Sequence, residues 1–209
     1  MYIDATFFCV EQSDVVAMND GDLVQQILNG NSNAFRFLVA KHQRLVAHIV
    51  GRIVQKREDV EDVSQEVFLK VYRKLKLFRG ESRLSTWIAK IAYNTSISHI
   101  RGQQKNEWSY DESPGLVSNE SDEALNQKVI EREEAKKYLL ELIEELPVQY
   151  RTVLTLFHLE EFSYREIEEI TEMPEGTIKS YLSRARKILK EKLEKVVVAE
   201  KTNIFMDYV

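Results

Sequence analysis

The sequence predicts an all-α protein made of two small helical domains joined by a flexible polar linker. Only 7 Gly and 3 Pro occur in 209 residues, whereas 30% of the residues are charged and Leu, Ile, Glu and Lys are abundant. This composition favours long helices over turn-rich sheets. Apolar residues recur at spacings of three and four over most of the chain, and a polar stretch interrupts this periodicity near the middle.

Charge and cysteine content exclude several classes of protein. The formal net charge of -5 argues against a uniformly basic nucleic-acid coat, because duplex affinity normally rests on Lys and Arg. Cys9 is the only cysteine, which excludes an intrachain disulfide and a thiolate metal cluster and fits a reducing, cytosolic setting. No apolar run approaches the roughly 18 residues of a membrane span. We therefore expect a cytoplasmic protein without membrane insertion.

The first domain is predicted at residues 21–101, after an N-terminal arm at residues 1–20. A short helix follows Asp22, and Asn29 to Asn31 form a turn before a longer helix. A third helix runs from about Glu58 to Leu77, and a fourth from about Ser85 to Arg101. Four helices joined by short loops suffice for one small bundle. The predicted core-facing stripes include Leu38, Leu45, Ile49, Ile53, Val60, Val63, Val67, Val71, Trp87, Ile88 and Ile91.

Periodicity stops after Arg101, where a Ser-rich polar segment containing Pro114 predicts a linker at residues 102–127. Helical patterning resumes in a second predicted domain, residues 128–195, and is punctuated by Pro147. Another helix, a short helix and a long basic helix follow. The tail at residues 196–209 has an irregular pattern that supports no assignment.

A helix-turn-helix is predicted inside the second domain. Ser163 and Glu166 have the spacing of a capping box, so a helix is expected to begin there. It ends near Ile170, because Pro174 and Gly176 break it, and a new helix opens around Glu175. A short helix, a tight turn and a second helix form the helix-turn-helix outline.

Basic residues are concentrated on the second of these helices, whereas Glu dominates the stretch from Glu160 to Glu175. The helix fits the major groove, and its N-terminal residues would meet base edges while later cations meet phosphates. A solvated basic face is the alternative, and the preceding cap and turn favour DNA binding. The candidates for base edges are Lys179, Ser180, Ser183 and Arg184, and those for phosphates are Arg186, Lys187 and Lys190.

Two further patterns occur in the first domain. Asp59, Asp62 and Glu66 share one face of the third helix, where a solvated face is the alternative to a binding surface. Catalysis or metal binding would require further converging ligands, and none is identifiable. The loop from Phe78 to Trp87 combines aromatic and basic residues around Gly80, as single-stranded DNA sites do. An ordinary helix connection is the alternative, and we expect Trp87 in the core.

These motifs resemble the sigma-70 family of RNA polymerase sigma factors, in particular its extracytoplasmic-function subfamily. Residues 146–186, including the helix-turn-helix, resemble domain 4, which reads the minus-35 element. Residues 59–72 are similar to region 2.2, and residues 78–94 to the minus-10 reading loop and its helix. The likeness spans residues 22–101 and 128–192. Glu168, Glu172 and Tyr181 depart from the family, which commonly has a small residue, Gly and Arg at those positions.

The resemblance implies an alternative sigma factor that binds core RNA polymerase and promoter DNA and is held by an anti-sigma factor. A stand-alone helix-turn-helix regulator and a protein-binding helical adaptor are the alternatives. No enzymatic activity, cofactor or metal is expected. The implied contacts are Asp59, Asp62, Gln65 and Glu66 for polymerase; Phe78, Arg79, Gly80, Ser82, Lys90, Asn94 and Arg101 for the minus-10 element; and Lys179, Ser180, Tyr181, Ser183, Arg184, Arg186 and Lys187 for the minus-35 element.

Overall fold

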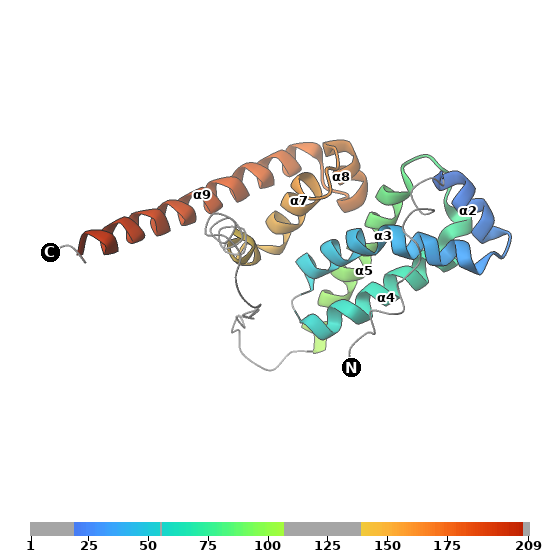
Figure 1. Ribbon diagram of the computed structural model, residues 1–209. Coiled ribbons are helices and arrows are strands. Elements are labelled where there is room, and N and C mark those ends of the chain that lie inside the picture. Colours follow the sequence, from blue (N-terminus) through green and yellow to red (C-terminus); the bar gives the residue numbers. More distant parts are fainter. Residues whose placement is uncertain (1–18, 55, 107–138, 207–209) are drawn as a thin grey trace, which may run out of the picture.

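The computed structural model describes residues 19–54, 56–106 and 139–206 (Figure 1). All regular secondary structure in these segments is helical, which confirms the predicted fold class. Most of the predicted N-terminal arm and linker, and the last three residues, lie outside the described segments. No helix within them is both long and apolar enough to cross a membrane.

The first helical unit begins earlier than the sequence pattern predicts. Helix α2 spans Asp20–Leu28, and its N-cap is Asn19, whose side chain accepts a hydrogen bond from the Gly21 amide. The predicted start is Asp22 because apolar periodicity starts at Leu23, whereas the cap precedes the first buried side chain by a full turn. After a turn at Gly30, which has a φ of 88°, helix α3 spans Ser32–Ile53.

Helix α4 spans Arg57–Lys74 and continues into the 3-10 turn η2, Leu75–Leu77. Helix α5 spans Leu84–Asn106 and therefore continues beyond Arg101 into the segment predicted as linker. Its last turns are tied to the bundle, because the Gln103 amide donates to the Asp59 carboxylate. Helices α2 to α5 enclose an apolar core that includes Leu23, Leu38, Ile49, Val63, Val67, Val71, Leu84 and Ile88.

The second unit contains the predicted helix-turn-helix. Residues 139–144 are helical and are followed by α7, Val148–His158. Helix α8 spans Tyr164–Thr171, and both hydrogen bonds of its predicted capping box are present. Helix α9 spans Glu175–Met206, so it includes most of the tail that supported no assignment, and its distal part extends away from both units (Figure 1). Leu146, Leu156, Ile167, Ile170, Ile178 and Leu182 form the centre of this unit.

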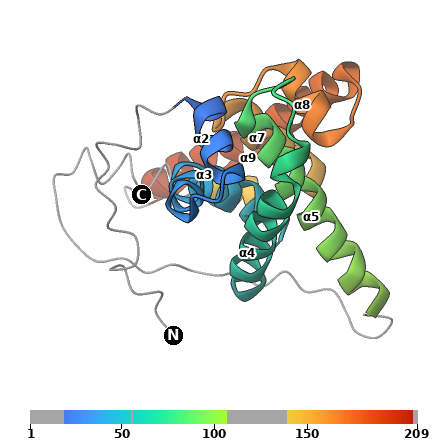
Figure 2. The same ribbon diagram turned by 90° about the vertical axis from the view of Figure 1, so that its right-hand side faces the viewer.

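The two units pack against one another through two helix pairs. Helix α7 contacts α3, and helix α8 contacts α5. Figures 1 and 2 show α7 and α8 lying against one end of the first bundle, with the helix-turn-helix next to the first turns of α5. This contact brings together the two sets of residues that the sequence pattern associates with nucleic acid.

Candidate nucleic-acid interface

The first half of α9 has one apolar face and one polar face. Ile178, Leu182 and Ala185 are almost completely buried, and this spacing anchors the helix in the second unit. The residues predicted to bind duplex DNA lie on the exposed side, apart from Tyr181, which is half-buried. These exposed residues are Lys179, Ser180, Ser183, Arg184, Arg186 and Lys187.

Neighbouring side chains orient the cations nearest the start of α9. The Lys179 ammonium lies 2.6 Å from the Glu175 carboxylate and 5.2 Å from the centre of the Tyr164 ring. Hydrogen bonding to Glu175 and its negative charge raise the pKa of Lys179. A hydrogen bond to Tyr150 raises the pKa of Arg184. Both side chains therefore remain charged while they are held next to aromatic rings.

Further aromatic side chains position Arg186 and Tyr181. The Arg186 guanidinium lies 3.1 Å from His158 Nε2 and 5.8 Å from the centre of the Phe157 ring. Burial and the charge of Arg186 lower the pKa of His158, which favours the neutral imidazole as the acceptor. The Tyr181 ring packs against Tyr150 with ring centres 5.0 Å apart. The basic face is thus supported by a row of rings.

The loop between η2 and α5 has the geometry that its sequence predicts. Gly80 adopts a φ of 71°, a left-handed conformation that glycine accepts without strain. Phe78 packs against Trp87, with ring centres 5.5 Å apart, and Trp87 is half-buried against the core. Arg79 is exposed beside them, and Ser82 is half-buried. The loop is therefore anchored by its aromatic residues while its arginine extends into solvent.

Three further candidate residues lie along α5. Lys90, Asn94 and Arg101 are separated by one and two helical turns, so they share one face. Asn94 and Arg101 are exposed, whereas Lys90 is only 37% exposed at its side chain. Burial, together with Glu172 and Tyr181 from the second unit, raises the pKa of Tyr93 on the same helix despite the opposing effect of Arg101. This face of α5 is consequently close to the helix-turn-helix.

The acidic face of α4 divides into two parts. Asp62, Gln65 and Glu66 are exposed, and Glu66 pairs with Lys70 at 2.8 Å. Asp59 instead accepts a hydrogen bond from Gln103 at 2.7 Å, which lowers its pKa. Asp59 therefore also stabilises the end of α5. Among the described residues, no group of three or more His, Cys, Asp or Glu side chains could hold a metal ion.

Comparison with known proteins matches both units in order. The family models for sigma-70 region 2 and sigma-70 region 4 match residues 38–106 and 136–189. The ECF RNA polymerase sigma-E factor of Escherichia coli K12 is 36% identical over 86% of this chain and 97% of its own length. The corresponding protein of Haemophilus influenzae is 33% identical over 85% of this chain and 96% of its own. The chain belongs to the extracytoplasmic-function sigma factors.

Structural comparison supports the same fold for this sigma factor. The sigma factor RpoE of Bartonella quintana, solved with the anti-sigma factor NepR, superposes with a TM-score of 0.61 and is 23% identical. That match covers 77% of this chain and 96% of the RpoE chain. The family consists of DNA-binding regulatory proteins rather than enzymes, and its function is to direct transcription initiation. These relatives give no support to the alternative of a stand-alone helix-turn-helix regulator.

In this sigma factor, carboxylates of the helix-turn-helix contact the first unit. Glu166 uses one oxygen for its capping box and the other for Thr86 and Arg83, at 3.2 Å and 3.6 Å. Burial of the Glu166 carboxylate opposes its ionisation, but hydrogen bonds from Ser163 and Thr86 and the charge of Arg83 lower its pKa overall. Glu172 pairs with Lys90 at 3.1 Å.

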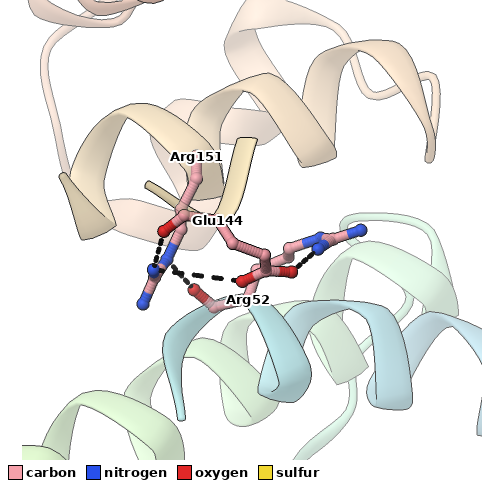
Figure 3. A network of polar contacts seen from close by, with 3 residues as sticks. All are labelled: Arg52, Glu144 and Arg151. Atoms are coloured by element: carbon pink, nitrogen blue, oxygen red, sulfur yellow. Dashed lines mark hydrogen bonds and ion pairs between the residues drawn. The ribbon is translucent and has the colours of Figure 1, made fainter. Parts of the chain in front are cut away.

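A second polar network joins α3 to α7. Arg151, only 2% exposed, donates through Nε to the Arg52 carbonyl and through Nη1 to the Glu144 carbonyl. The Glu144 carboxylate pairs with Arg52, so the two arginines and the glutamate form one cluster across the contact (Figure 3). Burial lowers the pKa of Arg151. One turn before Arg52, His48 contacts Glu160.

Sequence reasoning does not identify the residues that join the two units. In the sequence, Arg83, Thr86 and Glu166 are parts of a loop, a helix and a cap, and Arg52 and Arg151 are ordinary polar positions. Their partners are 80 or more residues away in sequence. The only signal is Glu172, which departs from the family's glycine without an evident function. Ion pairs between distant segments have no periodicity that a single sequence can reveal.

Proposed function

We propose that this sigma factor brings core RNA polymerase to promoters through two separate DNA contacts. Residues 21–101 form region 2, which binds polymerase and the opened minus-10 strand, and residues 128–195 form region 4, which binds the minus-35 duplex. Residues 102–127 connect them. Recognition at two sites gives an avidity that neither small unit has alone. The protein acts in the cytoplasm, and we assign no role to residues 1–20 and 196–209.

The observation that carries the proposal for region 4 is the two-sided character of α9. Its apolar face is fixed in the second unit, while its polar face places hydroxyl groups and cations within the first three turns. Those turns are the part of a recognition helix that meets base edges, and cations further along meet phosphates. Lys179, Ser180, Tyr181, Ser183 and Arg184 are the proposed base-reading positions, and Arg186 and Lys187 the proposed phosphate contacts.

Region 2 combines two proposed surfaces. The exposed acidic face of α4, with Asp62, Gln65 and Glu66 and with Asp59 at its edge, would meet a basic surface of polymerase. The anchored loop and α5 would hold single-stranded DNA, with a ring and hydroxyl near the bases and cations along the phosphates. The proposed minus-10 contacts are Phe78, Arg79, Gly80, Ser82, Lys90, Asn94 and Arg101.

An anti-sigma factor is a further proposed partner. The similar RpoE chain was solved in complex with one, and this sigma factor has the same fold over most of its length. We propose that such a partner covers the acidic face of α4, because binding there would block polymerase. Co-purification of core polymerase with the free protein, but not with the complex, would support this arrangement.

Run-off transcription with core polymerase on a promoter library tests the proposal. Wild-type protein is expected to give transcripts that share an upstream sequence. Changing both Asp62→Lys and Glu66→Lys should reduce them at least about tenfold, because reversing charge at a complementary interface costs several kcal/mol. Gel filtration with core polymerase should show the same loss of binding.

A matched control carries the changes Asp22→Lys and Glu141→Lys. Both side chains are exposed, lie outside α4 and give the same change in net charge. This control should transcribe as the wild type does. Equal loss in the two double variants would contradict a polymerase-binding role for α4. Absence of any transcript with wild-type protein and core polymerase would contradict the proposed function itself.

A further inference from the structure

Acidic side chains of region 4 form ion pairs with basic side chains of region 2 that lie at proposed DNA sites. Lys90, a proposed minus-10 contact, pairs with Glu172 in the turn of the helix-turn-helix. Arg83, the last residue of the proposed minus-10 loop before α5, lies 3.6 Å from Glu166. Two carboxylates therefore lie where DNA phosphates would bind. A strand and these carboxylates cannot hold the same cations at once.

The backbone at Glu172 adopts a conformation that favours glycine. Glu172 is the C-cap of α8 and has a φ of 60°, in the left-handed region. Glycine adopts this conformation without strain, whereas a residue with a Cβ does not. The chain thus accepts a strained residue at this turn. The glutamate side chain at this strained position is the one that reaches Lys90.

The same contact also lies next to the proposed recognition helix. Tyr181 is half-buried, and its phenol and Glu172 both contribute to the raised pKa of Tyr93 on α5. The Tyr181 ring itself packs against Tyr150 within region 4. In this arrangement cations at the proposed minus-10 surface are occupied by carboxylates, while the other proposed minus-35 residues stay exposed.

The contact between α7 and α3 contains buried polar groups that favour separation of the two units. Arg151 and Thr155 lie one turn apart on α7, on the side where Arg151 meets α3. Arg151 Nη2 and Thr155 Oγ1 are buried and have no hydrogen-bond partner among the described residues. Burying polar groups without partners is unfavourable, and separation of the units would expose the Arg151 group to water. The ion pairs that join the two units also weaken as salt rises.

We propose that Glu166 and Glu172 form an intramolecular latch, in which the acidic side of the helix-turn-helix binds Arg83 and Lys90 in place of promoter phosphates. The latch holds the free sigma factor in a closed state that binds DNA weakly. Polymerase and promoter bind the open state and shift the population towards it. The inference rests on the proposed function, since it assumes that these cations face DNA in the open state.

The test uses the full-length chain with Cys9→Ser and donor and acceptor dyes at Glu61→Cys and Glu191→Cys. These positions are exposed, lie in different units and are outside the proposed latch. The latch variant carries Glu166→Gln and Glu172→Gln, because glutamine at position 166 can still complete the capping box. The control carries Glu168→Gln and Glu169→Gln, which remove the same charge from exposed positions of α8.

Energy transfer between the dyes, measured without polymerase or DNA, reports the ratio of open to closed molecules. Two partly exposed ion pairs should raise that ratio by about three- to tenfold when they are removed. Binding of a fluorescent, randomised single-stranded DNA should tighten in the same proportion, because only the open fraction binds. The control should behave as wild type in both measurements. Equal energy transfer in latch variant, control and wild type would overturn the latch.

A charge swap keeps the test independent of folding defects. Glu172→Lys should open the molecule, and adding Lys90→Glu should restore the wild-type energy transfer. Failure of this restoration would overturn the proposed Lys90 pairing. Failure of the latch and failure of the proposed function are distinguishable: the dyes report closure alone, whereas run-off transcription by wild-type protein with core polymerase reports the proposed function.

Discussion

His42 is a buried titratable side chain in the first helical unit. It lies on α3, is 5% exposed, and its Nε2 has no hydrogen-bond partner among the described residues. Burial lowers its pKa from 6.5 to about 4, with a smaller opposing effect from Asp20 and a smaller reinforcing effect from Lys41. The folded protein therefore binds a proton at this site less readily than the unfolded chain does.

This difference predicts a loss of stability in mild acid. The folded pKa lies below the unfolded value, so the unfolded state takes up the proton first as the pH falls from about 6.5 towards about 4. Between about pH 7.5 and about pH 5, the free energy of unfolding should fall by about 2 kcal/mol from this group. Urea unfolding at the two pH values measures the change.

His42→Leu should remove most of that pH dependence while filling the same site. His158→Gln is the comparison variant: His158 is exposed on α7 and its pKa is also lowered, but less than that of His42, so its removal should take away only a smaller part of the pH dependence. A fall of the same size in the His42→Leu protein would show that another group is responsible. Asp59 and Glu166, whose pKa values are lowered, contribute little, because these groups are still mostly ionised at pH 5 in the unfolded chain as well.

Individual side chains differ in how far the sequence could predict them. The exposure of Lys179 and Arg184 followed from helical periodicity, because the buried positions around them were apolar. The environment of His42 did not, since periodicity places a residue on the core side without saying whether its polar atoms find partners. The contact of Glu166 with Arg83 and Thr86 could not be predicted either, because its capping role already accounted for a glutamate at this position.

The cap of α8, the first helix of the helix-turn-helix, leads to a prediction about stability. The Ser163 hydroxyl accepts from the Glu166 amide at 3.3 Å and donates to the Glu166 carboxylate at 2.7 Å. Ser163→Ala removes both bonds and should lower the free energy of unfolding by about 1 kcal/mol, a typical value for an N-cap. Urea unfolding at neutral pH measures it. Ser163→Thr keeps a capping hydroxyl, so equal losses in the two variants would contradict the cap as the cause.

Helices were predicted well in number and order within the described segments, but less well at their ends. The capping box fixed the start of α8, whereas α2 begins at Asp20 because its cap, Asn19, precedes any buried residue. Helix α5 continued to Asn106 because its last turns bond to Asp59 rather than bury apolar side chains. Helix α9 continued through residues without a clear apolar stripe. Caps and apolar periods are local signals, and these extensions depend on neither.

The arrangement of the two units could not be predicted from the sequence. A linker was inferred from composition, and two separate units followed from it. The contact between them includes ion pairs and buried polar groups such as Arg151, which are distributed along helices already explained by their own cores. Ion pairs in this contact are compatible with the proposed change between closed and open states.

Simultaneous use of both DNA-binding units requires a fixed distance between the two promoter elements. On a promoter selected from the library, inserting about five base pairs between them rotates one element by about half a helical turn relative to the other. Run-off transcription should fall at least about tenfold, because avidity is lost when geometry forbids both contacts at once. Replacing the same number of spacer base pairs without changing the length should have little effect. Undiminished transcription from the lengthened promoter would show that only one unit binds DNA at a time.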